Sequence, residues 1–390
     1  MIITQTSTRL SIFGGNTDFR EYFIKHGGKV LTASIDKYIY CIVKKKFDDL
    51  IIVNYSEKET VTKVDDLKHN IVREALKLVG ITKGIEISFL ADIPSQGTGL
   101  GSSSAVTVGV LNALHTYVGE NVSANQLAEE AVHIEIDILK NPIGIQDQCA
   151  VAFGGLRMFE FKAISGEVIT EKVKISESMQ EDFNNSLMLF YTGVTRNTNE
   201  VLSRFDVASN IEALNEKKLL VEKGVTALTS GNLGDFGRLL DKSWKTKRVA
   251  NTKTTTSEID VMYDKIMEAG ALGVKVIGAG GGGFMLVMFP ASKRAKIRKA
   301  LSVYKASEIS IFLSILLSPL LKTSGIDGCG FPPACPNKFS SNLPPPPVAS
   351  QTSPHSPRPR QQQRTRTAPA RVESRSRART PPQVRGSLES

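Results

Sequence analysis

The strongest constraint on the fold is a glycine- and serine-rich run at residues 94–105, which reads Pro-Ser-Gln-Gly-Thr-Gly-Leu-Gly-Ser-Ser-Ser-Ala. An apolar strand is predicted before it, at 85–91, and a helix after it, at 103–118. Glycines let a backbone approach an anion closely, and serines at a helix N-terminus add hydroxyl donors to the free N–H groups. The run therefore predicts a phosphate-binding loop; a flexible loop with a serine cap is the alternative.

Two other kinds of nucleotide-binding motif are disfavoured. No Gly-Lys-Ser/Thr sequence occurs, which disfavours a P-loop NTPase. The run Gly278–Gly283 matches the letters of a dinucleotide-binding fingerprint, but residues 284–289 read as a strand and not as a helix. We predict a glycine hairpin between strands at 274–277 and 284–289, small enough to contact the phosphate loop, or simply a tight turn.

A buried acid is predicted in the helix at residues 123–140. Ser123 and Gln126 form a capping box that fixes the start of this helix, and Glu135 then falls in the middle of its apolar arc. A carboxylate facing the interior is unfavourable unless a cation meets it. Glu135 is therefore a candidate magnesium ligand, with a buried salt bridge to Arg or Lys as the alternative.

A second acid follows in the sequence Gly-Ile-Gln-Asp-Gln, where Asp147 comes shortly after the turn at Asn141 and Pro142. A carboxylate at this place could orient an acceptor hydroxyl or remove its proton during phosphoryl transfer. The alternative for Asp147 is a turn-capping role.

Composition divides the 390-residue chain. Residues 303–390 hold 14 of the 17 prolines and carry +8 of the formal charge of +10. This tail has too little apolar surface to offset chain entropy, so we expect it to be disordered. The rest is nearly neutral, which disfavours nucleic-acid binding except non-specifically through the tail.

Strand and helix patterns before the tail predict two lobes, at residues 1–162 and 163–302. Strands are predicted at 9–13, 28–35, 38–44 and 85–91, and helices of the second lobe at 210–229, 233–247 and 257–270. The longest apolar run, 309–321, is shorter than the roughly 20 residues of a membrane helix. The four cysteines and five histidines do not have the spacing of a zinc site. Reduced thiols, and therefore a cytoplasmic protein, are favoured.

Three ordered motifs together resemble the GHMP kinases, the family of galactokinase, homoserine kinase and mevalonate kinase. They are the stretch 9–19, which reads Arg-Leu-Ser-Ile-Phe-Gly-Gly-Asn-Thr-Asp-Phe, the loop at 94–105 and the glycine run at 278–283. The resemblance implies an α+β fold with a lobe like ribosomal protein S5 domain 2, a ferredoxin-like lobe, and the cofactors ATP and Mg²⁺.

The resemblance also implies roles for single residues. Asp147 and Arg9 act at the acceptor hydroxyl, Asp18 binds sugar hydroxyls, and Ser103 and Glu135 hold magnesium. The residues expected to bind ATP are Pro94, Gly97, Gly99, Leu100, Gly101, Ser102, Ser103, Ser104, Gly280 and Gly281.

Within the family, the first motif, the sequence around Asp147 and the segment 189–196 look most like the heptose 7-phosphate kinases. This implies phosphorylation of the anomeric hydroxyl of D-glycero-D-manno-heptose 7-phosphate to the 1,7-bisphosphate, for nucleotide-activated heptose. The acceptor's own phosphate needs cations, for which Arg196 and Lys247 are the first candidates. Further candidates are Lys245, Arg248 and Lys253. Alternatives are L-fucose, a galactose-like sugar or mevalonate as acceptor, or a non-catalytic sensor.

The chain departs from the family pattern at two places. Asn16 stands where those heptose kinases usually have glycine. After Lys299 the family has a last helix and a closing strand, but here the sequence passes into the Pro- and Arg-rich tail. We therefore favour a frameshifted or fused terminus over an evolved binding tail.

Overall fold

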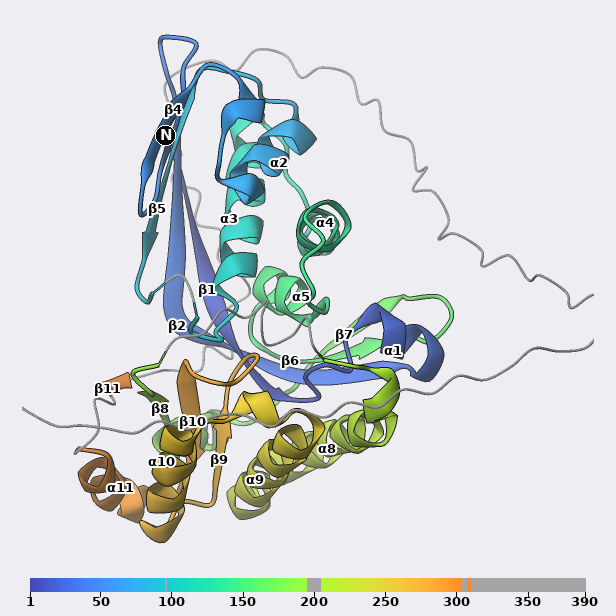
Figure 1. The fold of residues 1–390 in the computed structure, drawn as a ribbon, viewed down its shortest axis with the longest axis vertical. Coiled ribbons are helices and arrows are strands. Elements are labelled where there is room, and N and C mark those ends of the chain that lie inside the picture. The colour runs from blue at the N-terminus through green and yellow to red at the C-terminus, as the bar shows by residue number, and fades with distance from the viewer. Residues whose placement is uncertain (95–96, 195–204, 303–306, 310–390) are drawn as a thin grey trace, which may run out of the picture. The chain divides into compact units, whose positions relative to one another are not determined.

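The computed structural model describes residues 1–94, 97–194, 205–302 and 307–309. Within them the chain forms two β-sheets with helices packed against each (Figure 1). This is the predicted α+β fold with two lobes.

The first lobe is built on a seven-stranded sheet. Its strands follow the order β4-β3-β5-β2-β6-β7, with β1 paired to β2. We predicted two short strands at 28–35 and 38–44, but β2 is one long strand because its first half pairs with β6 and its second half with β5. The strands are β1 Ile2–Phe13, β2 Gly28–Lys45, β3 Ile51–Asn54, β4 Lys58–Val61, β5 Ile85–Ala91, β6 Leu156–Phe161 and β7 Val168–Lys172.

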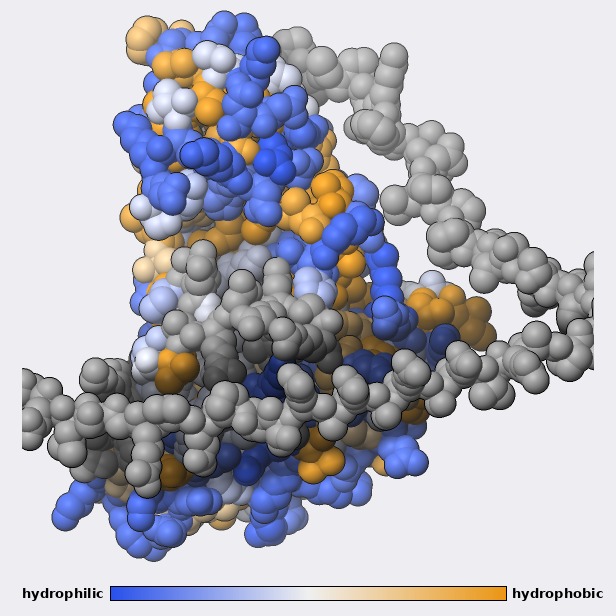
Figure 2. All heavy atoms as spheres, in the orientation of Figure 1, coloured by the Kyte–Doolittle hydropathy of each residue, from blue (hydrophilic) through white to orange (hydrophobic). Residues whose placement is uncertain are grey.

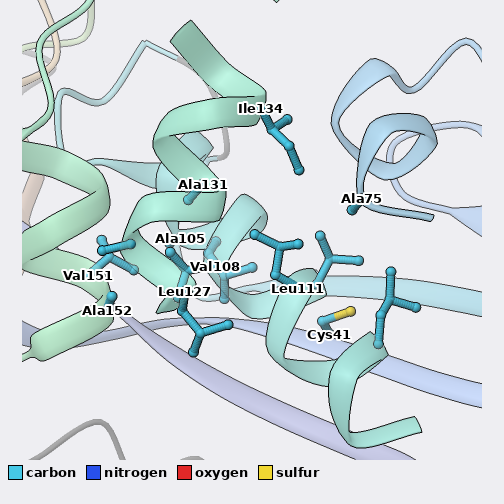
Figure 3. Packing of buried hydrophobic residues seen from close by; sticks show 14 of the residues in the cluster. Cys41, Ala75, Ala105, Val108, Leu111, Leu127, Ala131, Ile134, Val151 and Ala152 are labelled. Carbon is cyan, nitrogen blue, oxygen red and sulfur yellow. The ribbon is translucent and has the colours of Figure 1, made fainter. Parts of the chain in front are cut away.

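Helix α3 lies in the centre of the first lobe, between the sheet and the helices α2, α4 and α5. It is apolar on nearly all sides, and residues such as Val108 and Leu111 are buried among side chains from both layers (Figure 3). This packing fixes the start of α3 at the end of the predicted phosphate loop. The helical elements of the lobe are α1 Arg20–His26, η1 Val64–Asp66, α2 Asn70–Val79, α3 Ser102–Tyr117, α4 Ala124–Val132, the π-helix η2 His133–Ile138 and α5 Gln146–Phe153.

The second lobe has a four-stranded antiparallel sheet in the order β11-β8-β10-β9. With the strands numbered along the chain, the order across the sheet is 4-1-3-2, and helices separate the first strand from the second and the third from the fourth. This is the β-α-β-β-α-β topology of ferredoxin-like folds, as predicted. The elements are α6 Glu177–Asn185, β8 Leu187–Tyr191, η3 Ala208–Asn210, α8 Ile211–Thr229, α9 Leu233–Ala250, η4 Thr252–Thr254, α10 Ser257–Glu268, β9 Gly273–Val276, β10 Phe284–Met288, η5 Ala291–Lys293, α11 Arg294–Leu301 and β11 Ser307–Ile309.

Two predicted boundaries need correction. The lobe boundary at 162 falls inside the β6–β7 hairpin, and β7 extends the first sheet to Lys172. The expected tail begins too early, because residues 307–309 form β11, which pairs with β8 through its backbone and completes the second sheet. Backbone pairing needs no apolar pattern, so composition did not reveal this strand. The rest of the expected tail lies outside the described residues.

A shared core joins the two lobes next to the first motif. Leu10 and Phe13 of β1 belong to one apolar cluster with Phe236 of α9, and the rings of Phe13 and Phe236 meet edge to face at 5.2 Å. Beside them the buried Nζ of Lys275 in β9 donates to the carbonyls of Ser11 and Ile12, at 3.2 and 2.6 Å. The end of β1 is thereby held by side chains of both lobes.

Hydrophilic side chains cover most of the face seen in Figure 2, with smaller apolar patches between them. In the described ranges, no helix combines the length and apolar character needed to span a membrane.

The closing strand gives a test of where the folded body ends. Deleting residues 303–390 should lower the free energy of unfolding more than deleting 310–390, because only the longer deletion removes β11 from β8. Three paired residues predict a difference of about 1–3 kcal/mol. Chemical denaturation of the two truncated chains measures it, and equal stability would show that β11 is not needed.

Candidate active site

The predicted phosphate loop connects β5 to α3, as the sequence indicated. Gly97, Gly99 and Gly101 have positive φ values of 68°, 75° and 74°, a conformation that glycine adopts without strain. The helix begins directly after Gly101, so the N–H groups of its first turn lack partners within the helix. Those donors, with the serine hydroxyls, can bind phosphate oxygens. Ser95 and Gln96 lie outside the described residues.

The glycine run at 278–283 packs directly on this loop. A Cβ on Gly278 would lie 2.4 Å from the Cα of Gly99, and one on Gly283 would lie 2.6 Å from the carbonyl oxygen of Thr98. Real side chains do not fit at such distances, so the two loops meet backbone to backbone. The predicted hairpin and its contact with the loop are both confirmed, and Gly280 and Gly281 remain predicted ATP contacts.

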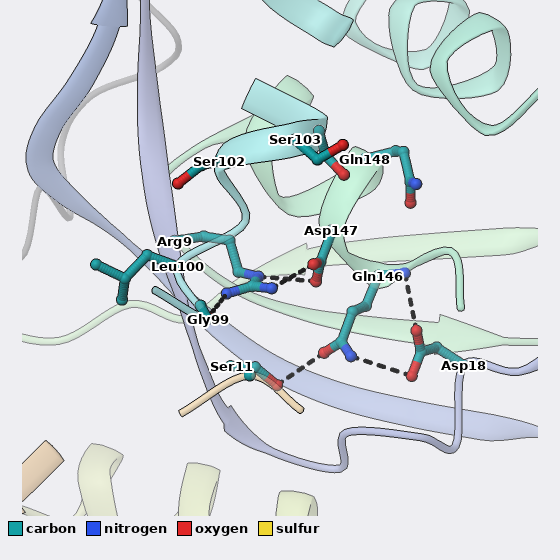
Figure 4. A network of polar contacts seen from close by, with 12 residues as sticks. Arg9, Ser11, Asp18, Gly99, Leu100, Ser102, Ser103, Gln146, Asp147 and Gln148 are labelled. Atoms are coloured by element: carbon teal, nitrogen blue, oxygen red, sulfur yellow. Dashed lines mark hydrogen bonds and ion pairs between the residues drawn. The ribbon is translucent and has the colours of Figure 1, made fainter. Parts of the chain in front are cut away.

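Arg9 links the phosphate loop to the second acid (Figure 4). Its Nε donates to Oδ1 of Asp147 at 2.8 Å, its Nη2 donates to Oδ2, and its Nη1 donates to the carbonyl of Gly99 at 2.7 Å. Arg9 is only 3% exposed, whereas the Asp147 side chain is 26% exposed. One buried guanidinium thus joins a loop carbonyl to a carboxylate that solvent can reach.

Asp147 lies in the first turn of α5 but does not cap it, since no side-chain hydrogen bond caps this helix. Its carboxylate instead forms a two-bond ion pair with Arg9. Each carboxylate oxygen has a second lone pair, so the pair leaves acceptor capacity for a hydroxyl group. The geometry therefore does not support the turn-capping alternative.

Asp18 lies close to Asp147 and is almost completely buried. It accepts hydrogen bonds from the N–H of Asn16 at 2.9 Å, and from the N–H and Nε2 of Gln146 at 3.1 and 3.2 Å. Burial, and next the charge of Asp147, raise the pKa of Asp18 to about 6. At neutral pH the carboxylate is charged and can accept from hydroxyl groups.

Sequence reasoning missed Gln146. It donates to Asp18 and accepts from the Ser11 hydroxyl at 2.8 Å, so it ties the first motif to the start of α5 (Figure 4). A signal was present, because Gln146 directly precedes Asp147 in the quoted motif. The cost of burying a charge, which singled out Glu135, does not apply to a neutral amide.

The departure at Asn16 has a structural explanation. Asn16 has φ of 77°, in the left-handed region. Glycine adopts this conformation freely, and asparagine is among the few other residues that tolerate it. The turn before Asp18 is therefore kept without glycine.

Glu135 is fully buried, as the helical wheel predicted. It accepts from the hydroxyls of Ser103 and Ser104, at 2.5 and 2.8 Å, and from Nε2 of Gln148 at 2.5 Å. Burial raises the pKa of Glu135, against these three donors. Among the described residues, no Lys or Arg pairs with Glu135, which removes the salt-bridge alternative there.

The helix around Glu135 is not the regular helix to Lys140 that we predicted. It changes at His133 into a π-helix, in which the Leu139 N–H donates to Ile134, five residues back. Such wide turns are rare and concentrate at functional sites.

The residues present fit a magnesium ion. Mg²⁺ takes oxygen ligands and usually binds through one or two carboxylates together with substrate phosphates. Ser103 is exposed at the start of α3, and Glu135 lies directly behind it. In the described ranges, no group of three or more Asp, Glu, His or Cys residues could hold a metal ion. Ser103 and Glu135 would hold the ion after giving up their mutual hydrogen bond, and the ion would neutralise phosphate charge.

The cations predicted to bind an acceptor phosphate are placed differently. Lys247 is buried, and its Nζ donates to the carbonyls of Val276 and Gly278 at 3.1 and 2.6 Å. Burial lowers its pKa well below the usual value. Lys247 thus supports the glycine hairpin, and its phosphate role stays a prediction. Arg196 lies outside the described residues. Lys245 pairs with Asp241, Arg248 pairs with Asp260, and Lys253 is exposed.

Comparison with known proteins assigns the family. Residues 69–155 match the N-terminal domain of GHMP kinases, and residues 225–306 match the C-terminal domain. The D-glycero-alpha-D-manno-heptose 7-phosphate kinase of Campylobacter jejuni is 30% identical over 316 residues, which cover 77% of this chain and 93% of that enzyme. The chain belongs to the GHMP kinase family.

Other GHMP kinases are also similar. The L-fucokinase/L-fucose-1-P guanylyltransferase of Bacteroides fragilis is 24% identical over 356 residues, covering 80% of this chain but 37% of that longer protein. The crystal structure of a D-glycero-D-manno-heptose 1-phosphate kinase from Bacteroides thetaiotaomicron has a TM-score of 0.68 at 23% identity, covering 80% and 96% of the two chains. It supports the fold, and membership of the family makes this protein an ATP-dependent sugar kinase, as predicted.

The Glu135 contacts generate a prediction about the metal. Glu135→Gln should raise the Mg²⁺ concentration needed for half-maximal activity about tenfold or more, because an amide replaces the carboxylate that accepts from the Ser103 hydroxyl. A magnesium titration at saturating ATP measures the change. Glu129→Gln, an exposed position on the preceding helix, is the control. An unchanged titration would show that Glu135 only anchors the first turn of α3.

Proposed function

We propose that this GHMP kinase phosphorylates the anomeric hydroxyl of D-glycero-D-manno-heptose 7-phosphate, using ATP and Mg²⁺. The observation that carries the proposal is the Arg9 bridge, which joins the phosphate loop to Asp147, the carboxylate whose charge Asp18 feels. The similarity to the Campylobacter jejuni enzyme, which extends over 93% of that protein, supports the choice of a heptose phosphate.

The proposed reaction divides the site into two halves. The first turn of α3 and the loop before it bind the phosphates of ATP, and Asp147 receives the acceptor hydroxyl. The acceptor oxygen attacks the γ-phosphorus in line, the bond from phosphorus to the β-phosphate oxygen breaks, and the hydroxyl proton passes to Asp147. Arg9 holds the carboxylate in place and carries positive charge next to the transferred group.

Asp18 and Gln146 form the sugar side of the proposed site. A charged Asp18 accepts hydrogen bonds from sugar hydroxyls more strongly than a neutral acid does. Because its pKa lies at about 6, this binding weakens as the pH falls through that value. We therefore assign the loss of acceptor affinity at low pH to protonation of Asp18.

The function is tested by measuring ADP release with heptose 7-phosphate, heptose 1-phosphate, the bare heptose, L-fucose, galactose and mevalonate. We expect heptose 7-phosphate to have the highest kcat/KM, about 100-fold or more above the bare sugar. Phosphorus NMR of the product should show a second phosphate, on the anomeric oxygen. Equal turnover of the bare sugar, or faster turnover of another acceptor, would refute the assignment, and no turnover of any acceptor would favour a sensor.

The role of Asp147 gives a separate prediction. Asp147→Asn should lower kcat by about 10²–10⁴-fold, because the amide cannot take the proton, while the ATP dissociation constant changes little. Single-turnover kinetics and ATP titration measure the two effects. Asp137→Asn, in the π-helix η2, where the carboxylate is partly exposed and pairs with Arg20, is the control. Chemical denaturation accompanies both variants, since the amide leaves the Arg9 charge uncompensated.

A further inference from the structure

A buried lysine on α8 lies beside the sugar half of the site and takes no part in the chemistry proposed so far. On α8, residues 217, 221 and 224 share one face, since they are spaced by four and three. Gly224 packs against the Phe13 ring, and Val221 packs at the position of Gly14. One turn earlier, Lys217 therefore faces the chain that continues from Gly14 toward Asp18.

Lys217 lacks the partners that a buried cation normally has. It is 4% exposed, and its ammonium lies 5.7 Å from the ring centre of Phe205. Within the described ranges, no hydrogen bond or ion pair joins it to another residue. The other buried lysines there, Lys247 and Lys275, each donate to two backbone carbonyls. Among the described residues, Lys217 is thus the buried lysine whose ammonium donates no hydrogen bond.

The surrounding charge favours an anion at this place. Lys247 and Lys275 are each repelled by Lys217 and by Arg9, and the Asp18 carboxylate attracts Lys217. Burial lowers the pKa of Lys217 to about 8, and Asp18 opposes this change, so the ammonium is charged at neutral pH. An unpaired buried ammonium is unfavourable, and an incoming phosphate would supply the missing acceptors.

We propose that Lys217 binds the phosphate that the acceptor already carries, and so selects a phosphorylated sugar over the bare sugar. The inference rests on the proposed function, because it requires the acceptor to bind beside Asp18. Lys217 is not among the lysines considered from the sequence, which lie on α9 and on η4 after it. A bare sugar would leave its ammonium buried and without an acceptor.

The test compares Lys217→Met with the matched variant Lys218→Met. Lys218 is the next residue of α8, but it donates to the carbonyls of His26 and Gly27 and lies 5.8 Å from the ring centre of Tyr22. For Lys217→Met we expect kcat/KM for heptose 7-phosphate to fall about 10- to 100-fold, mostly through KM. Turnover of the bare sugar and the KM for ATP should change less than about threefold. Lys218→Met should change none of these values appreciably.

Stability separates substrate binding from a structural role. Without substrate, Lys217→Met should unfold at the same or a higher denaturant concentration, because it removes an unpaired buried charge. Titration calorimetry with heptose 7-phosphate and no ATP should show the loss of affinity directly. Should the methionine variant not fold, Lys217→Gln carries the same expectation for kcat/KM and for calorimetry.

The outcomes distinguish the two proposals. An equal loss on phosphorylated and bare acceptor, or no loss on either, would overturn the role of Lys217 while leaving the heptose phosphate assignment intact. If the unmodified enzyme does not prefer the phosphorylated acceptor, the proposed function itself fails, and the role of Lys217 fails with it.

Discussion

The geometry of the site depends on the guanidinium of Arg9. A buried cation needs a partner with good hydrogen-bond geometry, and Asp147 supplies one through two parallel bonds. The third bond, to the carbonyl of Gly99, fixes the loop against the same group. The distance between the glycine loop and the Asp147 carboxylate is therefore set by one planar side chain, which can be positioned more accurately than a flexible ammonium.

Arg9 can do this because both lobes hold the strand that carries it. β1 pairs with β2 over most of its length, and its end packs on Phe236 of the second lobe. Lys275 adds hydrogen bonds to the carbonyls of Ser11 and Ile12. Burial, and next the charges of Lys217 and Arg9, lower the pKa of Lys275 to about 7. The core that stabilises the lobe contact thus also positions the reactive groups.

Much of this arrangement could be predicted from the sequence, because several signals agreed. Spacing around a helical wheel placed Glu135 inside, and the strand-turn-helix pattern located the phosphate loop. The glycine hairpin was recognised because a strand, and not a helix, follows it. These are local patterns, and local physics determines them.

Other features depend on contacts between distant parts of the chain. Lys247 looked like a surface cation at the end of a helix, but the packing of α9 on β9 buries it. Lys217 gave no signal, since a lysine on an amphipathic helix is an ordinary residue, and Gln146 had only its place beside Asp147 in the quoted motif. β11 is defined by its pairing with β8. A segment of three residues is too short to show a strand pattern in the sequence.

The contact between the two glycine loops has a consequence for how substitutions combine. The backbones of Gly99 and Gly278 are in direct contact, and a Cβ on either would overlap the other, although almost 180 residues separate them in the chain. A side chain at either position forces the same separation of the loops, so most of the damage is done by the first substitution. The free energies of the two changes are thus not additive, and the pair behaves as a single position divided between two lobes.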